Sequence, residues 1–160
     1  MSEKRIEDFV NDFHTGDTKI KLLDFVAFLR INEILFERCQ YGYWEDKIYW
    51  NTKLRNRYLC NILINDDDEN SWVIWFDGGD SDWFKNYPLD ERIKEIVWRN
   101  ADFCGGCGYC SGGKRKSIFG KDFDNICRTP VCFKNPDNEE LACMKKLIEI
   151  RKNDILNQTV

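Results

Sequence analysis

Eight cysteines against a single histidine are the feature of this 160-residue sequence that most limits what it can bind. Two cysteines separated by two residues can chelate one metal ion when a tight turn lies between them, and interspersed glycines permit such a turn. The pattern therefore predicts a metal site built from thiolates. Six of the cysteines lie between residues 104 and 143, in the order Cys104-Gly-Gly-Cys107-Gly-Tyr-Cys110, Cys127-Arg-Thr-Pro-Val-Cys132 and Cys143.

Zinc is the cofactor that this spacing favours. Nineteen residues separate Cys107 from Cys127, and two cysteine clusters at that separation are typical of zinc sites. Four cysteine ligands close a tetrahedral shell and leave no position for water or substrate, so we expect a structural role. Five candidate ligands compete for four places: Cys104, Cys107, Cys110, Cys127 and Cys132. The simplest set omits Cys110.

An iron–sulfur cluster is the first alternative to zinc. The spacing Cys104-x2-Cys107-x2-Cys110 matches the start of the bacterial ferredoxin pattern, but no Cys-Pro follows at the expected distance. Cys127 or Cys132 could complete such a cluster. The alternative therefore stays open.

Thiol-redox chemistry is the second alternative for the same segment. Cys110 lies near Lys114 and Arg115, and neighbouring cations stabilise a reactive thiolate. A disulfide framework is disfavoured, because no secretion signal is visible and a chain of this length has a core of its own. We expect Cys60 and Cys143 to be buried structural thiols, since both lie among apolar residues.

Hydrophobic periodicity predicts four helices and three strands. The helices cover Arg5–Phe13, Lys19–Ile31 with a possible extension to Cys39, Pro88–Asn100 and the residues after Asn135-Pro136. The strands run through residues 44–50, 58–64 and 72–76, and their short connections predict an antiparallel meander.

These elements predict an α+β protein with a small three-stranded antiparallel sheet packed against helices. A C-terminal cysteine-rich metal-binding loop module and a closing helix complete it. The expected parts of this single domain are an α+β core (residues 1–103), a zinc-binding module (104–134) and a C-terminal helix packing on the core (135–160).

Basic residues gather in the cysteine-rich segment. Residues 104–134 contain six basic and two acidic residues, against 18 and 26 in the rest of the chain. Lys114, Arg115 and Lys116 could contact a partner or phosphates, which makes nucleic-acid contact a further alternative. The overall charge of −4 disfavours nucleic acid, and cations that merely surround a thiolate site explain the patch as well.

Aromatic residues of the predicted strands could form a binding surface for a small molecule. The candidates are Trp44, Trp50, Tyr58 and Trp75, whereas the even-numbered residues from Trp72 to Phe76 fit the core. His14 has no neighbouring nucleophile that would make it a general base, so we expect it on the surface.

The sequence excludes some classes of protein and favours another. No apolar run is long enough for a membrane span, and the N-terminus lacks the apolar core of a signal peptide, so a cytoplasmic protein is expected. No catalytic motif of a common hydrolase or metalloprotease occurs. The leading expectation is a non-enzymatic, zinc-stabilised protein that binds a small molecule or a partner.

The chain resembles small cysteine-rich proteins of clostridia and related bacteria that have no assigned function. The resemblance depends on Phe28-Leu29-Arg30, the strand Tyr58–Ile64, the spacing Cys104-x2-Cys107-x2-Cys110, the run Ile118–Cys127 and Asn135-Pro136-Asp137. Residues 18–100 are also similar to the YdhG-like and MmcQ-like α/β domains in the order of their elements. The resemblance implies a fold and no reaction.

Overall fold

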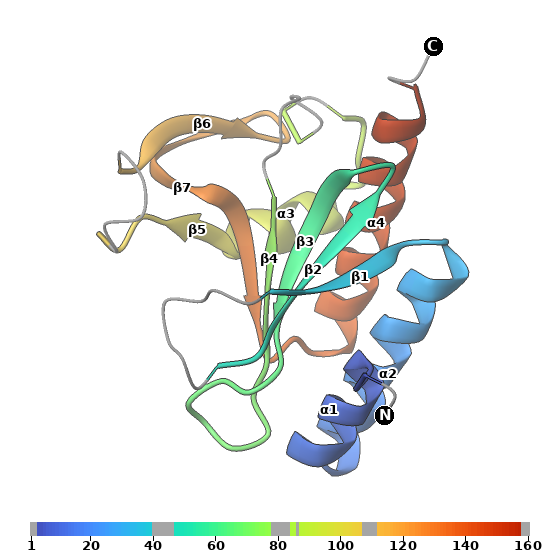
Figure 1. The fold of residues 1–160 in the computed structure, drawn as a ribbon. Coiled ribbons are helices and arrows are strands. Elements are labelled where there is room, and N and C mark those ends of the chain that lie inside the picture. The colour runs from blue at the N-terminus through green and yellow to red at the C-terminus, as the bar shows by residue number, and fades with distance from the viewer. Residues whose placement is uncertain (1–2, 40–46, 78–83, 86, 107–111, 158–160) are drawn as a thin grey trace.

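The computed structural model describes residues 3–39, 47–77, 84–85, 87–106 and 112–157. These residues form four helices and seven strands (Figure 1). The helices are α1 (Ile6–Phe13), α2 (Gly16–Ile31), α3 (Glu91–Arg99) and α4 (Asn138–Asn157). The strands are β1 (Leu35–Cys39), β2 (Tyr49–Leu54), β3 (Arg57–Leu63), β4 (Val73–Phe76), β5 (Ala101–Phe103), β6 (Lys114–Ile118) and β7 (Lys121–Lys134).

The four predicted helices are confirmed, and local capping explains where two of them begin. Before α3, the Asp90 carboxylate accepts a hydrogen bond from the backbone N–H of Arg92 (2.8 Å). Before α4, Asp137 accepts from the N–H of Glu140 (2.8 Å), while the Glu140 carboxylate accepts from the N–H of Asp137 (3.3 Å). Each contact satisfies an N–H group that a helix start leaves without an intrahelical partner.

The prediction of a small three-stranded sheet is wrong, because the protein has one seven-stranded antiparallel sheet. Its order is β1-β2-β3-β4-β7-β5, with β6 also paired to β7. The predicted meander is present as β2-β3-β4, but it is only the middle of the sheet. Residues 104–134, expected as a loop module, include β6 and the 14-residue β7, which pairs with β4.

The error at β1 has a local cause. Residues up to Cys39 could have continued α2, but Glu33 adopts a left-handed conformation (φ 62°) that ends the helix. The N–H of Glu33 donates to the carbonyl of Arg30, and the N–H of Ile34 donates to that of Leu29. These two bonds form a Schellman motif, which usually contains glycine or asparagine at the left-handed position. Because Glu33 is neither of these residues, the sequence did not indicate that the helix ends there.

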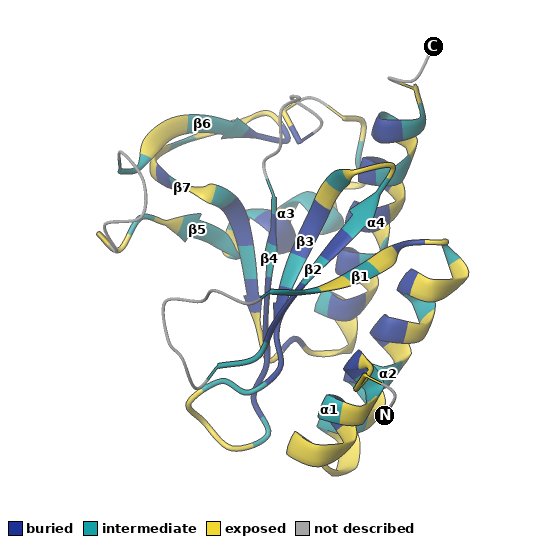
Figure 2. Ribbon diagram, viewed as in Figure 1, coloured by how far each residue is buried: buried dark blue, intermediate teal, exposed yellow. Residues whose placement is uncertain are grey.

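All four helices share one hydrophobic core with one face of the sheet (Figure 2). Alternate strand residues point to opposite faces, so Ile62, Ile74 and Phe76 lie in this core. The other face carries a separate small apolar cluster to which no described helix contributes. We call this face the open face, and its cluster consists of the buried residues Tyr49, Leu63 and Val73 with the partly buried Cys39, Trp75 and Cys132.

The helices of the described residues do not meet the requirements for crossing a membrane. None of α1 to α4 is both long and apolar enough to do so. The longest of them, α4, carries charged side chains such as Lys145, Lys146 and Lys152 along its length.

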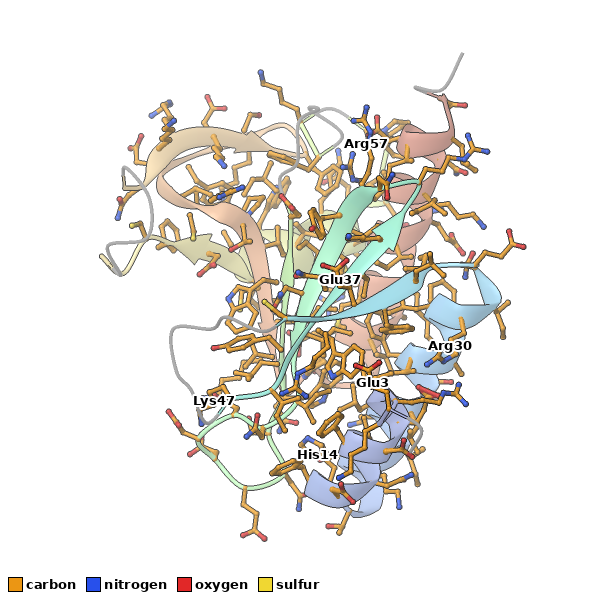
Figure 3. All side chains as sticks on the ribbon, in the orientation of Figure 1. Glu3, His14, Arg30, Glu37, Lys47 and Arg57 are labelled. Atoms are coloured by element: carbon orange, nitrogen blue, oxygen red, sulfur yellow. The ribbon has the colours of Figure 1, made fainter. Side chains whose placement is uncertain are left out.

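His14 is buried, contrary to the expectation of a surface histidine. It follows α1 and lies close to the sheet (Figure 3), with 2% of its surface exposed. Its Nε2 donates to the carbonyl oxygen of Ile64 at 2.5 Å. This hydrogen bond therefore connects the segment between α1 and α2 to the residue that follows β3.

Removing this hydrogen bond should destabilise the fold. In His14→Leu the Ile64 carbonyl loses its side-chain donor in a buried position, so the free energy of unfolding should fall by about 1–3 kcal/mol. Urea denaturation measures the change. The control Ile20→Ala alters a side chain that is 67% exposed and should shift stability by no more than about 0.5 kcal/mol. Equal stability of His14→Leu and the unchanged protein would contradict the assigned role.

Candidate functional site

The predicted metal ligands fall into three groups in the structure. Cys104 follows β5 directly, while Cys127 and Cys132 lie on β7. Cys107 and Cys110 lie outside the described residues. The described candidates therefore gather where β5 and β7 pair.

Residues 104–113 contain Cys104, Cys107 and Cys110 and connect β5 to β6. Both of these strands pair with β7 (Figure 1). Phe103, the last residue of β5, pairs with Ile126 of β7. Lys114, the first residue of β6, pairs with the same Ile126. Residues 104–113, which we call the cysteine loop, therefore leave and rejoin the sheet at one position.

The two ends of the cysteine loop meet at Asn125. The N–H of Cys104 donates to the Asn125 carbonyl (2.8 Å), and the Asn125 side-chain amide donates back to the Cys104 carbonyl (3.4 Å). At the other end, Gly113 packs so closely that a Cβ there would lie 2.8 Å from the Cys104 Cβ and would collide with the Asn125 side chain. Only glycine fits this approach without displacement.

Cys127 and Thr129 of β7 and Asp102 of β5 form a cluster of a thiol, a hydroxyl and a carboxylate. The Thr129 hydroxyl lies 3.3 Å from the Asp102 carboxylate and 3.6 Å from the Cys127 sulfur. Burial raises the pKa of the half-buried Asp102, while hydrogen bonds from Thr129 and Cys127 oppose the shift. The Lys116 ammonium donates to the Cys127 carbonyl (3.3 Å). Both the thiol and the backbone carbonyl of Cys127 therefore take part in hydrogen bonds.

Cys132 occupies a different environment. Its N–H donates to the Asn100 carbonyl, and its thiol packs against the apolar cluster of the open face. Burial raises the pKa of Cys132 to about 12, and negative charge on Asp102 and Cys127 adds to the shift. At neutral pH this thiol is protonated, which is unfavourable for a metal ligand.

The described residues do not by themselves form a metal site. Among them, no group of three or more histidine, cysteine, aspartate or glutamate side chains is arranged to hold an ion. Cys60 and Cys143 are buried free thiols, as expected. Any thiolate site at the cysteine loop would need Cys107 or Cys110.

The predicted aromatic binding residues do not share one surface. Trp50 belongs to the core and contacts Phe9. Trp75 lies on the open face, where its ring centroid is 6.2 Å from that of Tyr49. Tyr58 is 40% exposed, and Trp44 lies outside the described residues. Tyr49, which the sequence analysis did not select, is therefore the aromatic partner of Trp75.

The basic residues of the β6–β7 hairpin contact the hairpin and its neighbours. Arg115 pairs with Asp122 and Asp124, and Lys116 binds the Cys127 carbonyl as described. The Lys121 ammonium lies 5.3 Å from ring centroids on both Trp98 and Phe123. Lys114 begins β6 and is exposed. The positive charge of Arg115 is thus compensated locally by two carboxylates.

Comparisons with known proteins returned no relative of this chain. No protein-family model matches it, no curated protein matches it, and no solved structure matches it. A function therefore has to be inferred from the side chains described above.

Gly113→Ala should destabilise the protein by opposing closure of the cysteine loop. The new methyl group has to displace Asn125 or Cys104, and overpacking of this kind costs about 1–3 kcal/mol. Gly105→Ala is the matched control, because nothing lies within 4 Å of a Cβ at that position. Urea denaturation of both variants tests the difference. Equal effects of the two substitutions would contradict the close approach at Gly113.

Three thiols with raised pKa values should resist alkylation in the folded protein. Burial raises the pKa of Cys60, Cys132 and Cys143 to about 12, so about one thiol in ten thousand is ionised at pH 8. Iodoacetamide should modify them only after unfolding, as mass spectrometry of digested protein would show. Rapid modification of folded Cys132 would contradict the raised pKa of its thiol.

The same thiols should make the fold less stable at high pH. In the unfolded chain they ionise near pH 9, whereas in the folded protein they stay protonated up to about pH 12. The unfolded state therefore loses protons first, and the free energy of unfolding should fall as the pH rises from 9 towards 12. Substituting Cys143→Ala should weaken this dependence, which urea denaturation across the pH range measures.

Proposed function

We propose that this chain is a zinc-stabilised binding protein in which Cys104, Cys107, Cys110 and Cys127 hold the metal. The observation that carries the proposal is the closure of the cysteine loop at Asn125, two residues before Cys127. Joining the ends of the cysteine loop reduces the chain entropy that is lost when its thiols converge on one ion. Three ligands then come from the loop and the fourth from β7.

The choice of Cys127 over Cys132 rests on their surroundings. Both residues are partly exposed, but the Cys127 thiol contacts polar groups, Thr129 and Asp102. Cys132 is packed among apolar side chains, and its raised pKa opposes the deprotonation that metal binding requires. This set differs from the simplest one suggested by spacing, because Cys110 replaces Cys132.

The proposed role of the metal is structural. Four thiolates complete the shell, and such sites contribute about 10–16 kcal/mol of binding free energy in model peptides. The metal would fix the loop beside the part of β7 that continues into the open face. On that face Tyr49 is buried and Trp75 is partly exposed, so Trp75 marks the surface we assign to a ligand or partner. No catalytic step is needed for this function.

Metal analysis of matched cysteine variants tests the proposal. Protein purified under reducing conditions should contain about one zinc ion per chain, as expected for a single four-cysteine site. Cys127→Ser should lose most of that zinc, whereas Cys132→Ser should retain it. Elemental analysis of the dialysed proteins gives both results.

Each other outcome changes the conclusion in a definite way. Iron with acid-labile sulfide and visible absorption would replace zinc by an iron–sulfur cluster. Zinc lost in both variants would return Cys132 to the ligand set. No bound metal in the unchanged protein would end the proposal.

A further inference from the structure

Four residues that pair across neighbouring strands form a row on the open face of the sheet. Glu37 of β1 pairs with Asn51 of β2, Asn51 pairs with Asn61 of β3, and Asn61 pairs with Trp75 of β4. Paired residues of antiparallel strands point to the same side of a sheet, and Trp75 lies on the open face. We call these four residues the cross-strand row. Because strands lie about 4.8 Å apart, the row extends over roughly 14 Å.

The two amides of the cross-strand row orient each other and keep further hydrogen-bonding groups. The Asn61 Nδ2 donates to the Asn51 Oδ1 at 2.6 Å, and both side chains are partly exposed. A primary amide has two N–H donors and one acceptor oxygen. Both N–H groups of Asn51, together with one N–H group and the oxygen of Asn61, are therefore available to a ligand.

The charges beside these amides cancel. The Glu37 carboxylate forms an ion pair with the ammonium of Lys53, which lies on β2. The cross-strand row and Lys53 together therefore carry no net charge. Binding of phosphate-bearing ligands depends on an excess of basic side chains, so this surface favours a neutral ligand.

Trp75 provides an apolar surface at one end of the row. Its ring centroid lies 6.2 Å from that of Tyr49, and this contact with a buried residue holds the partly exposed tryptophan in place. An aromatic ring beside amides matches the chemistry of a sugar. One face of a sugar ring presents C–H groups that pack on an aromatic ring, and each of its hydroxyl groups both donates and accepts hydrogen bonds.

From this arrangement we infer that the cross-strand row binds a neutral oligosaccharide. One sugar ring packs against Trp75, and the hydroxyl groups of the next sugar bind Asn61 and Asn51. The row is longer than one sugar ring, so we expect at least two linked sugars to bind. The inference rests on the binding role proposed for the open face, but it does not require the metal, because none of the four residues lies in the cysteine loop or on β7.

Isothermal titration calorimetry with three neutral trisaccharides tests the inference. The probes are cellotriose, maltotriose and triacetylchitotriose, and adenosine monophosphate is the comparison because it also stacks on aromatic rings but carries a phosphate. At least one trisaccharide should bind the unchanged protein, and it should bind more tightly than adenosine monophosphate.

Matched variants locate the binding surface. Trp75→Ala should weaken trisaccharide binding about tenfold or more, because the sugar loses its aromatic contact. Asn51→Asp keeps the oxygen that Asn61 binds and removes both N–H donors, so binding should weaken about 2–10-fold. Tyr87→Ala is the control, because this 37% exposed aromatic residue belongs to no strand of the sheet, and its binding should not change. Urea denaturation shows whether each variant folds. If Trp75→Ala does not fold, Asn51→Asp still decides the test, because its internal hydrogen bond is kept.

The outcomes separate this inference from the metal proposal. Absence of binding by all three trisaccharides would overturn the inference, and so would equal affinities of Asn51→Asp and Tyr87→Ala. Tighter binding of adenosine monophosphate would replace the sugar by a nucleotide. Zinc content is measured in the same samples, so sugar binding without zinc would end only the metal proposal, and zinc without sugar binding would end only this inference.

Discussion

The pairing of β7 with three other strands is the constraint on which the rest of the structure depends. One end of this 14-residue strand pairs with β4 and so continues the meander, from Val73 against Lys134 to Phe76 against Val131. The remainder pairs with β5 and β6. Backbone hydrogen bonds of β7 therefore connect the N-terminal strands to the cysteine loop. Its core side chains, such as Phe133 against Phe76, join the same core as the helices.

Sequence reasoning recovered the parts of this fold that have local signals. The predicted starts of α3 at Pro88 and of α4 after Asn135-Pro136 lie close to the observed ones, where Asp90 and Asp137 cap the helices. The strands β2 to β4 have short connections and aromatic or β-branched residues. In contrast, β1 follows a left-handed Glu33, and β6 and β7 lie in a segment rich in glycine, charge and cysteine. These segments can be identified as strands only from their pairing in the sheet, β1 with β2 and β6 with β7.

The metal site suggested by the sequence stays a prediction, and the sequence did not predict how the cysteines are arranged. The spacing of the cysteines indicated a metal, and the structure distinguishes the polar surroundings of Cys127 from the apolar surroundings of Cys132. That difference arises from strand register, which places Cys132 opposite Trp75. The contact of Thr129 with Asp102 depends on the irregular pairing of β5 with β7 between Ala101 and Phe103. No local pattern encodes either relation.

The shared attachment of β5 and β6 to Ile126 has a consequence for how this protein can change over time. The chain between them begins and ends at the same place, so its length does not affect the register of either strand. Insertions or deletions there are expected to leave the sheet continuous, because the two ends of the connection lie close together. The number of cysteines can thus be gained or lost in evolution while the scaffold persists, and the same position is the natural point for grafting a foreign peptide.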